Sequence, residues 1–329
     1  MKKILVAGAY GYLGAKISKY LAQKGNRVTA FGHSTPSENT QWSSLMDEVI
    51  IGDIRNESII LKLAEKKYDV LINLISLDHH KSENKANFVS SINVLPSWNL
   101  LEKLSKSGLK KFIYFSACQV YGKIPFKEIT EDFIPSPQNT YGLTHLLSEN
   151  ICNYYNKKTN INCINVRLSS GYGSPIFWEN NCWWLVINDF CKTAFSEKKI
   201  KLLSEGAALR DFIHNTDVVR AIEILVDTDK KYLQNNTYHI SSGKTLNILK
   251  LAHTVKIVYQ KRYQHEIQII LPDNSISVNP NKFLKTERYT INNSKLKLLG
   301  FIPRVDLKTG INEIFDYLEN NYENNCRRI

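Results

Sequence analysis

A glycine-rich loop near the N-terminus is the first candidate for binding a ligand. Gly8, Gly11 and Gly14 have G-x-x-G-x-x-G spacing between a short apolar run, residues 3–7, and a segment of helical apolar spacing, residues 15–24. Such glycines permit a tight turn and a close backbone approach to a pyrophosphate, and the helix N-terminus adds free N–H groups and a positive dipole end. The pattern therefore favours a dinucleotide site over an ordinary glycine-rich turn. Its predicted residues are Gly8, Tyr10, Gly11, Tyr12, Leu13 and Gly14.

The residues after the second apolar run, 31–35, bear on the choice of cofactor. In dinucleotide-binding proteins a carboxylate at this place accepts hydrogen bonds from the ribose 2′-hydroxyl of NAD. Here the residues are Phe-Gly-His-Ser-Thr, without a carboxylate. Because Gly32 leaves room and His33 and Ser34 can donate hydrogen bonds, we expect NADP in preference to NAD. The alternative is an exposed loop that accepts NAD less selectively.

A second pair of residues could meet the adenine ring of a dinucleotide. Asp53 and Ile54 directly follow the third apolar run, residues 48–51. A turn-forming aspartate is the competing interpretation of Asp53.

Strand-like and helix-like segments alternate along the chain. Segments of helix-compatible composition separate the apolar runs, which are residues 3–7, 27–31, 48–51, 70–75, 112–115 and 163–166. This alternation predicts an α/β fold with a Rossmann-type, doubly wound parallel sheet. It weakens after about residue 170. We therefore expect a dinucleotide-binding domain over residues 1–170 and mainly a smaller substrate-binding lobe over 171–329, with some segments returning to the Rossmann core.

The composition is that of an ordinary folded protein. The chain has 329 residues, of which 43% are hydrophobic and 22% charged, and its formal net charge is +12. The lysines are scattered and no nucleic-acid-binding motif is present, so we expect no nucleic-acid partner. The six cysteines lack zinc-ligand spacing and no apolar run is long enough to cross a membrane, so we expect no metal, no membrane contact and a cytoplasmic location.

Six ordered motifs carry a resemblance to a known family. They are Asn93-Val94 with Asn99-Leu100-Leu101, Lys111 to Ser116 leading into Val120-Tyr121-Gly122, Pro137 to Thr144, Arg167 with Gly171-Tyr172-Gly173, Arg210 to His214 with Asp217-Val218, and Asn293-Ser294-Lys295 with Leu299-Gly300-Phe301. Together with the glycine loop, they make the chain resemble the extended short-chain dehydrogenase/reductases over nearly its whole length. The nucleotide-sugar epimerases, dehydratases and ketoreductases are the most similar group.

The resemblance implies a catalytic tyrosine, a lysine four residues later and an upstream serine or threonine. Tyr141 matches the tyrosine, but the fourth residue after it is His145. The upstream position is Ala117, and Ser116 is one residue away. We predict Tyr141, His145 and Ser116 as the catalytic residues, with Tyr141 and His145 also meeting the cofactor. Histidine is largely neutral at pH 7, so its effect on the tyrosine should be weaker than that of lysine.

The resemblance also implies residues that contact the substrate. Cys118 and Gln119 stand where dehydratases of the family carry acids, which disfavours a dehydratase. Arg210 resembles the arginine that meets the substrate diphosphate, although an ion pair with Asp211 or Asp217 is an alternative. The predicted substrate residues are Cys118, Gln119, Ser170, Arg210 and Arg288, with Lys285 as an alternative to Arg288.

These expectations define a function. We expect an NAD(P)-dependent oxidoreductase or epimerase that acts on a nucleotide-activated sugar by hydride transfer, in the synthesis of surface polysaccharide precursors. The resemblance implies a homodimer. The alternative is a catalytically degenerate member that binds dinucleotide or nucleotide sugar as a sensor or scaffold. The tryptophans in residues 177–184 could stack on a nucleobase or could pack the small lobe.

Overall fold

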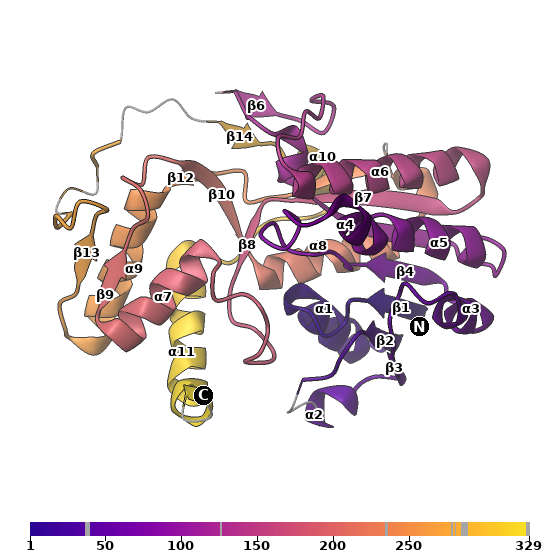
Figure 1. The fold of residues 1–329 in the computed structure, drawn as a ribbon, viewed down its shortest axis with the longest axis horizontal. Coiled ribbons are helices and arrows are strands. Elements are labelled where there is room, and N and C mark those ends of the chain that lie inside the picture. The colour runs from indigo at the N-terminus through magenta and orange to yellow at the C-terminus, as the bar shows by residue number, and fades with distance from the viewer. Residues whose placement is uncertain are drawn as a thin grey trace.

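A seven-stranded parallel sheet forms the centre of the protein. The computed structural model describes residues 1–36, 40–125, 127–233, 236–277, 279, 281–283 and 289–326 (Figure 1). The strand order is β11-β7-β5-β4-β1-β2-β3, and every neighbouring pair is parallel. The strands are β1 (Lys3–Ala7), β2 (Arg27–Gly32), β3 (Glu48–Ile51), β4 (Val70–Asn73), β5 (Lys111–Ala117), β7 (Asn162–Leu168) and β11 (Thr237–Ile240). The predicted Rossmann-type fold is confirmed.

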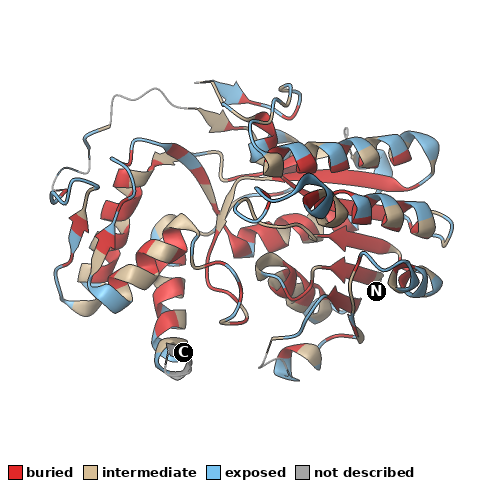
Figure 2. Cartoon of the chain, in the orientation of Figure 1, coloured by how far each residue is buried: buried red, intermediate tan, exposed pale blue. Residues whose placement is uncertain are grey.

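Helices cover both faces of this sheet, which explains why its strands carry apolar side chains on both sides. Ile4 and Val6 of β1 pack with one group of helices, and Leu5 and Ala7 pack with the other. The strands are accordingly buried (Figure 2). The first face carries α1 (Tyr12–Gln23) and α8 (Asn215–Asp227), and the second carries α3 (Glu57–Glu65), α5 (Leu95–Leu104) and α6 (Thr140–Lys158). Two short helices, α2 (Thr40–Ser43) and α4 (Ala86–Asn93), complete the N-terminal part.

The C-terminal part forms a smaller lobe with its own core, at the left of Figure 1. In it α7 (Val186–Glu197) packs against α9 (Ile248–Tyr263) and α11 (Leu307–Cys326). The remaining strands are short. One sheet contains β8 (Ser170–Tyr172), β10 (Leu209–His214) and β12 (Thr245–Asn247), while β9 (Lys199–Lys201) pairs with β13 (Gln268–Ile270) inside the lobe and β6 (Glu128–Ile129) pairs with β14 (Thr290–Ile291). Short helices are η1 (Cys118–Tyr121), η2 (Lys230–Tyr232) and α10 (Ser294–Leu298).

The two parts of the chain exchange elements. Strand β11 and helix α8 come from beyond residue 171, yet β11 is the edge strand of the main sheet and α8 packs on α1. The division of the chain at residue 170 stays a prediction. Among the described residues, no helix combines the length and apolar character needed to cross a membrane.

A buried ion pair attaches α6 to the sheet. Glu149 of α6 accepts hydrogen bonds from Nε and Nη2 of Arg167 on β7, at 3.0 and 2.7 Å to its two oxygens. Ser116 of β5 donates its hydroxyl to the same carboxylate at 2.5 Å. Because all three side chains are buried, this contact sets the position of α6 along the sheet.

Candidate active site

The glycine loop has the geometry of an anion site. Gly8 has a φ of +89°, and a Cβ atom on Gly14 would lie 2.0 Å from the carbonyl oxygen of Gly8. Gly11 is exposed at the N-terminus of α1, where no side chain caps the helix and no acidic residue occupies its first turn. The first-turn N–H groups are therefore open to a ligand, and a pyrophosphate fits them by charge and by donor geometry.

The residues after β2 and β3 lie at the same edge of the sheet as this loop. His33, Ser34 and Thr35 are exposed, and Ile54 is buried. Asp53 accepts hydrogen bonds from the backbone and the guanidinium of Arg55, each at 2.9 Å. These bonds, opposed by partial burial and aided by the nearby His33, lower the pKa of Asp53 to about 2. Asp53 is thus a carboxylate at neutral pH, available to a ligand beside it.

An aromatic cluster fills the space above the end of β2. The ring of Tyr10 lies so close to Gly32 that a Cβ atom there would be 2.8 Å from Tyr10 Cδ2. Trp42 and Phe177 pack against this ring, with centroids 4.9 and 6.0 Å away. Asn180 adds a hydrogen bond from Nδ2 to the carbonyl oxygen of Tyr10 at 2.8 Å. The room that the sequence predicted above Gly32 is therefore occupied by the side chain of Tyr10.

Tyr141 and His145 lie together on the first turns of α6. Their rings meet edge to face, with centroids 4.4 Å apart. The cap of α6 is Asn139, whose side chain accepts a hydrogen bond from the N–H of Gly142 at 2.7 Å. The predicted i, i+4 pair is thus formed, and it faces the loop that follows β4.

His145 is held by neutral hydrogen bonds. Its Nδ1 lies 2.8 Å from the hydroxyl of Tyr114, and its Nε2 lies 3.4 Å from that of Ser76. Because Ser76 donates its proton to the carbonyl oxygen of Leu77 at 2.8 Å, it can only accept from His145. The proton of the neutral imidazole is therefore on Nε2, and Nδ1 accepts from Tyr114.

Burial lowers the pKa of His145 to about 4, so the ring is uncharged at pH 7. For Tyr141, burial and the negative charge of Asp78 raise the pKa to about 12. A fixed cation would act in the opposite direction. Tyr141 consequently carries its proton throughout the neutral range.

The side chains next to Ala117 bind groups other than Tyr141. The hydroxyl of Ser116 is used by Glu149, on the side of the strand opposite to that of Ala117. Cys118 donates to the carbonyl oxygen of Arg167 at 3.7 Å, and burial raises the pKa of its thiol, so it is no nucleophile. Gln119 accepts a hydrogen bond from Asn139 at 3.2 Å, at the start of α6. The structure therefore does not bring Ser116 to Tyr141.

Arg210 lies at a groove of about 460 Å³ between the lobe and the residues that follow η1. Gly122, Ala208 and Tyr289 also line it. The acids proposed as alternative partners bind other groups, because Asp211 accepts from Ser169 at 2.8 Å and Asp217 from Arg220 at 2.7 Å. Ser170 lies on β8, paired with Phe212 of β10. Arg288 and Lys285 lie outside the described residues.

The tryptophans of residues 177–184 divide between two sites. Trp178 and Trp183 pack with Tyr317 in the core of the lobe, which matches the packing alternative. Trp184 lies instead against His79 and His80, with centroids 4.8 and 5.7 Å away.

The loop after β4, which contains Asp78, His79 and His80, was missed by the sequence analysis. The sequence feature that could have identified this loop is its position directly after a strand, since ligands of parallel sheets bind beyond the carboxyl ends of the strands.

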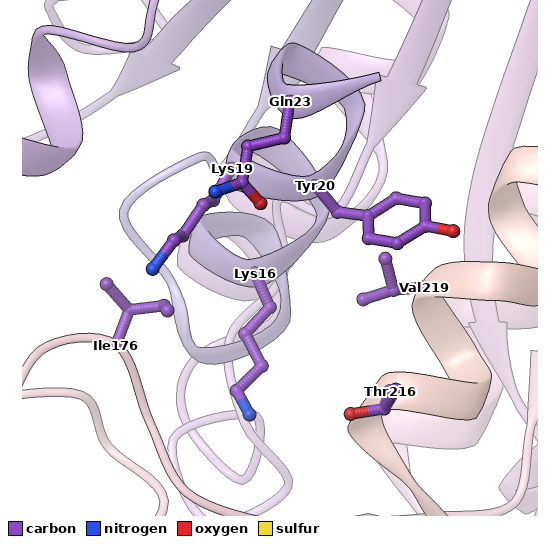
Figure 3. Close-up of a pocket in the computed structure, with 7 residues that line it drawn as sticks. All are labelled: Lys16, Lys19, Tyr20, Gln23, Ile176, Thr216 and Val219. Atoms are coloured by element: carbon purple, nitrogen blue, oxygen red, sulfur yellow. The ribbon is translucent and has the colours of Figure 1, made fainter.

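A second cavity, of about 170 Å³, lies between α1 and α8 (Figure 3). Lys16, Lys19, Tyr20, Gln23, Ile176, Thr216 and Val219 line it, and no residue predicted for the cofactor or the substrate is among them. Lys16 is already paired with Glu313 at 3.1 Å. This cavity is therefore separate from the candidate active site.

The fold and the open glycine loop, with a tyrosine at the same edge of the sheet, are those of a dinucleotide-binding enzyme. Residues 4–241 match the model of the NAD dependent epimerase/dehydratase family, and the chain belongs to this family.

Relatives and solved structures agree with this assignment. The dTDP-D-glucose 4,6-dehydratase of Bos taurus is 24% identical over 84% of this chain and 75% of its own length. The UDP-glucose 4-epimerase of Thermotoga maritima, solved with UDP-glucose, superposes with a TM-score of 0.82 at 20% identity, over 97% of this chain and 99% of its own. The UDP-glucuronic acid 4-epimerase of Bacillus cereus, solved with UDP-glucuronic acid and NAD, has a TM-score of 0.78 at 23% identity, with the same coverage.

We predict that His145→Lys lowers the pKa of Tyr141. A cation within one helical turn favours the tyrosinate and shifts such a pKa by about 1 to 3 units. Tyrosinate absorbance is titrated in the variant with and without Tyr141→Phe, and the difference isolates this one phenol. In the wild type the same difference should show no ionisation below about pH 11. Identical titrations of His145→Lys and the neutral control His145→Gln would contradict the prediction.

Proposed function

We propose that this protein is an NAD-dependent oxidoreductase or epimerase acting on a nucleotide-activated sugar, in the synthesis of surface polysaccharide precursors. The observation that carries the proposal is the convergence of three features at one edge of the sheet. The open N-terminus of α1 suits a pyrophosphate, Tyr141 lies on α6 beside His145, and Arg210 lines a groove next to the η1 segment. The names of the family and of the relatives support the same reaction class.

The cofactor would transfer the hydride, and residues of the chain would transfer the proton and bind the substrate. The nicotinamide, when bound, accepts or returns a hydride. Tyr141 handles the proton of the reacting sugar oxygen. Because its pKa is raised to about 12, Tyr141 carries this proton at pH 7 and starts in the form that can donate to the oxygen of a keto sugar, although as a weaker acid than an ordinary tyrosine. At neutral pH the tyrosinate that would take a proton from a sugar hydroxyl is scarce, so proton transfer is expected to be slow in both directions.

His145 positions groups and supplies no charge. Its Nε2–H donates to Ser76 over a long distance of 3.4 Å, so this weak hydrogen bond can be exchanged for one to a ribose hydroxyl at little cost in free energy. Arg210 offers a planar pair of donors to a diphosphate. The resulting enzyme lacks the usual cation near its tyrosine, and slow turnover is expected. The alternative of a binding protein without turnover rests on this same feature.

The cofactor is the second part of the proposal. The sequence favoured NADP because it left room above Gly32, but Tyr10 fills that space with Trp42 and Phe177 around it. A 2′-phosphate would have to displace a buried ring. We therefore favour NAD, with Asp53 and Ile54 at the adenine and Tyr12 and Leu13 at the pyrophosphate.

A homodimer is the third part. Helices α5 and α6 pack side by side, and each exposes apolar side chains. Leu95 and Trp98 of α5 are 46% and 49% exposed, and Leu143, Leu147 and Tyr154 of α6 are 47%, 44% and 51% exposed. A second copy that brings the same two helices would bury this patch in a symmetric contact. The expected dimer of the family supports this choice of partner.

Turnover is the test of the proposed activity. The protein is incubated with NAD or NADH and a panel of UDP-, dTDP- and GDP-sugars, and both NADH absorbance and the sugar products are followed. Tyr141→Phe should lower the rate by about 10² or more, as for the loss of a general acid, while the variant still binds the cofactor. Binding of both ligands by the wild type without any turnover would support the binding-protein alternative instead.

Cofactor choice is tested by titration with NADH and NADPH, followed by nicotinamide emission and calorimetry. The wild type should bind NADH at least about tenfold more tightly, and Tyr10→Ala should narrow this difference by relieving the clash with the 2′-phosphate. Tyr20→Phe, a tyrosine on α1 that is not part of this aromatic cluster, is the control and should leave the ratio unchanged. A wild type that prefers NADPH would overturn this assignment.

The dimer is tested by light scattering at micromolar concentration. Trp98→Glu combined with Leu147→Glu should yield a monomer, because two like charges would be buried at the symmetric contact. Leu203→Glu, at a fully exposed leucine of the lobe, is the matched control and should remain dimeric. A monomeric wild type would contradict the proposal.

A further inference from the structure

One acidic side chain lies beside the tyrosine without being part of the predicted site. Asp78 belongs to the loop between β4 and α4, and its side chain is 15% exposed. One carboxylate oxygen accepts the N–H of Lys81 at 2.9 Å, and the other accepts Nδ2 of Asn181 at 2.8 Å. The carboxylate is therefore held in one orientation by two donors that carry no charge.

Hydrogen bonds attach this loop to α6 on both sides of Asp78. Before it, Ser76 contacts His145, and Leu77 donates its N–H to Asn93 at 2.8 Å. The same Asn93 donates to Thr144 of α6 at 3.0 Å. After it, Glu83 accepts a hydrogen bond from Thr140 at 3.4 Å. Asp78 is thus placed over the first turn of α6, which agrees with its electrostatic effect on Tyr141.

A second loop closes the other side of this region. Residues 178–185, which precede α7, contribute Asn181 to Asp78 and Trp184 to the imidazole rings of His79 and His80. The two loops come from the Rossmann part and from the lobe. They meet where Asp78 and Asn181 are hydrogen-bonded, beside the first turn of α6 that carries Tyr141.

Two acidic side chains and one lysine lie around this contact. Asp78 and Glu83 are acidic, His145 is neutral, and burial together with His80 lowers the pKa of His79. Lys81 is the cation next to Asp78, with Nζ 3.9 Å from its carboxylate, but its side chain is 65% exposed and screened by water. Among the groups that shift the pKa of Tyr141, none is a cation.

We propose that Asp78 determines sugar specificity by repelling a carboxylate on the substrate, so that the site takes uncharged or amino sugars and rejects uronic acids. The inference rests on the proposed function and narrows its substrate class. Like charges brought together in a partly buried site discriminate strongly, because neither is fully solvated. The Bacillus cereus structure with UDP-glucuronic acid shows that the fold can accept a uronic acid in another protein.

The experiment has two stages. First, UDP, dTDP, GDP and ADP are titrated to find the nucleotide that the protein binds. Then the glucose and glucuronic acid forms of that nucleotide are compared in the wild type, in Asp78→Asn and in Asp132→Asn. The asparagine at position 78 keeps an oxygen acceptor for the loop. Asp132 is the control because its side chain is 74% exposed and pairs with Lys295.

The wild type should bind the glucose form at least about tenfold more tightly, and added salt should reduce this ratio. Asp78→Asn should bring the two forms to within about threefold of one another while leaving the affinity for the nucleoside diphosphate unchanged. The control should behave as the wild type. Equal affinities in the wild type, or an unchanged ratio in Asp78→Asn, would overturn this inference alone. Failure to bind any of the four nucleotides would overturn the proposed function as well.

Discussion

The contact between Glu149 and Arg167 controls where the candidate active site lies. Tyr141, His145 and Glu149 follow one another at intervals of four residues, so they occupy one face of α6. Glu149, 1% exposed, is bound by the guanidinium of Arg167 and by the hydroxyl of Ser116, and Arg167 in turn donates to Tyr121 at 2.8 Å. Removing one partner of such a pair leaves a buried charge and costs about 3 to 5 kcal/mol. Rotation or sliding of α6 is therefore opposed. Tyr141 is held at the edge of the sheet where β1 leads into the glycine loop.

The neutral side chain of His145, at the position where the resemblance implied a lysine, determines how this edge is organised. A lysine would bring a positive charge, which needs anions or water around it. The neutral imidazole instead joins a chain of hydroxyl groups from Tyr114 to Ser76, and burial opposes its protonation. As a result, the charge that Tyr141 meets is that of Asp78. The site is better suited to keeping a proton on the tyrosine than to removing one.

The parts of the structure that depend on backbone and pattern could be predicted from the sequence. The parallel sheet follows from apolar runs that need burial on both faces, and the glycine loop follows from backbone conformations that few other residues adopt. The adjacency of Tyr141 and His145 follows from helical periodicity alone. Contacts between segments far apart in the chain could not be predicted in this way. Ser116 was expected near the tyrosine, but its partner Glu149 becomes apparent only when α6 and β5 are packed together.

The same distinction explains why Asp78 and Tyr10 had to come from the structure. In the sequence Asp78 is an ordinary loop aspartate. Only in the folded protein does Asn181, more than a hundred residues later, donate a hydrogen bond to it. Tyr10 was assigned to the glycine loop for its backbone, whereas its ring, packed against Trp42 and Phe177, fills the space above Gly32 that the sequence was expected to leave open for a 2′-phosphate. Functions carried by backbone N–H groups tolerate any side chain that leaves the backbone in place. Selectivity for a cofactor or a sugar depends on side chains that meet only in the folded protein, so it can differ between relatives that share the fold throughout.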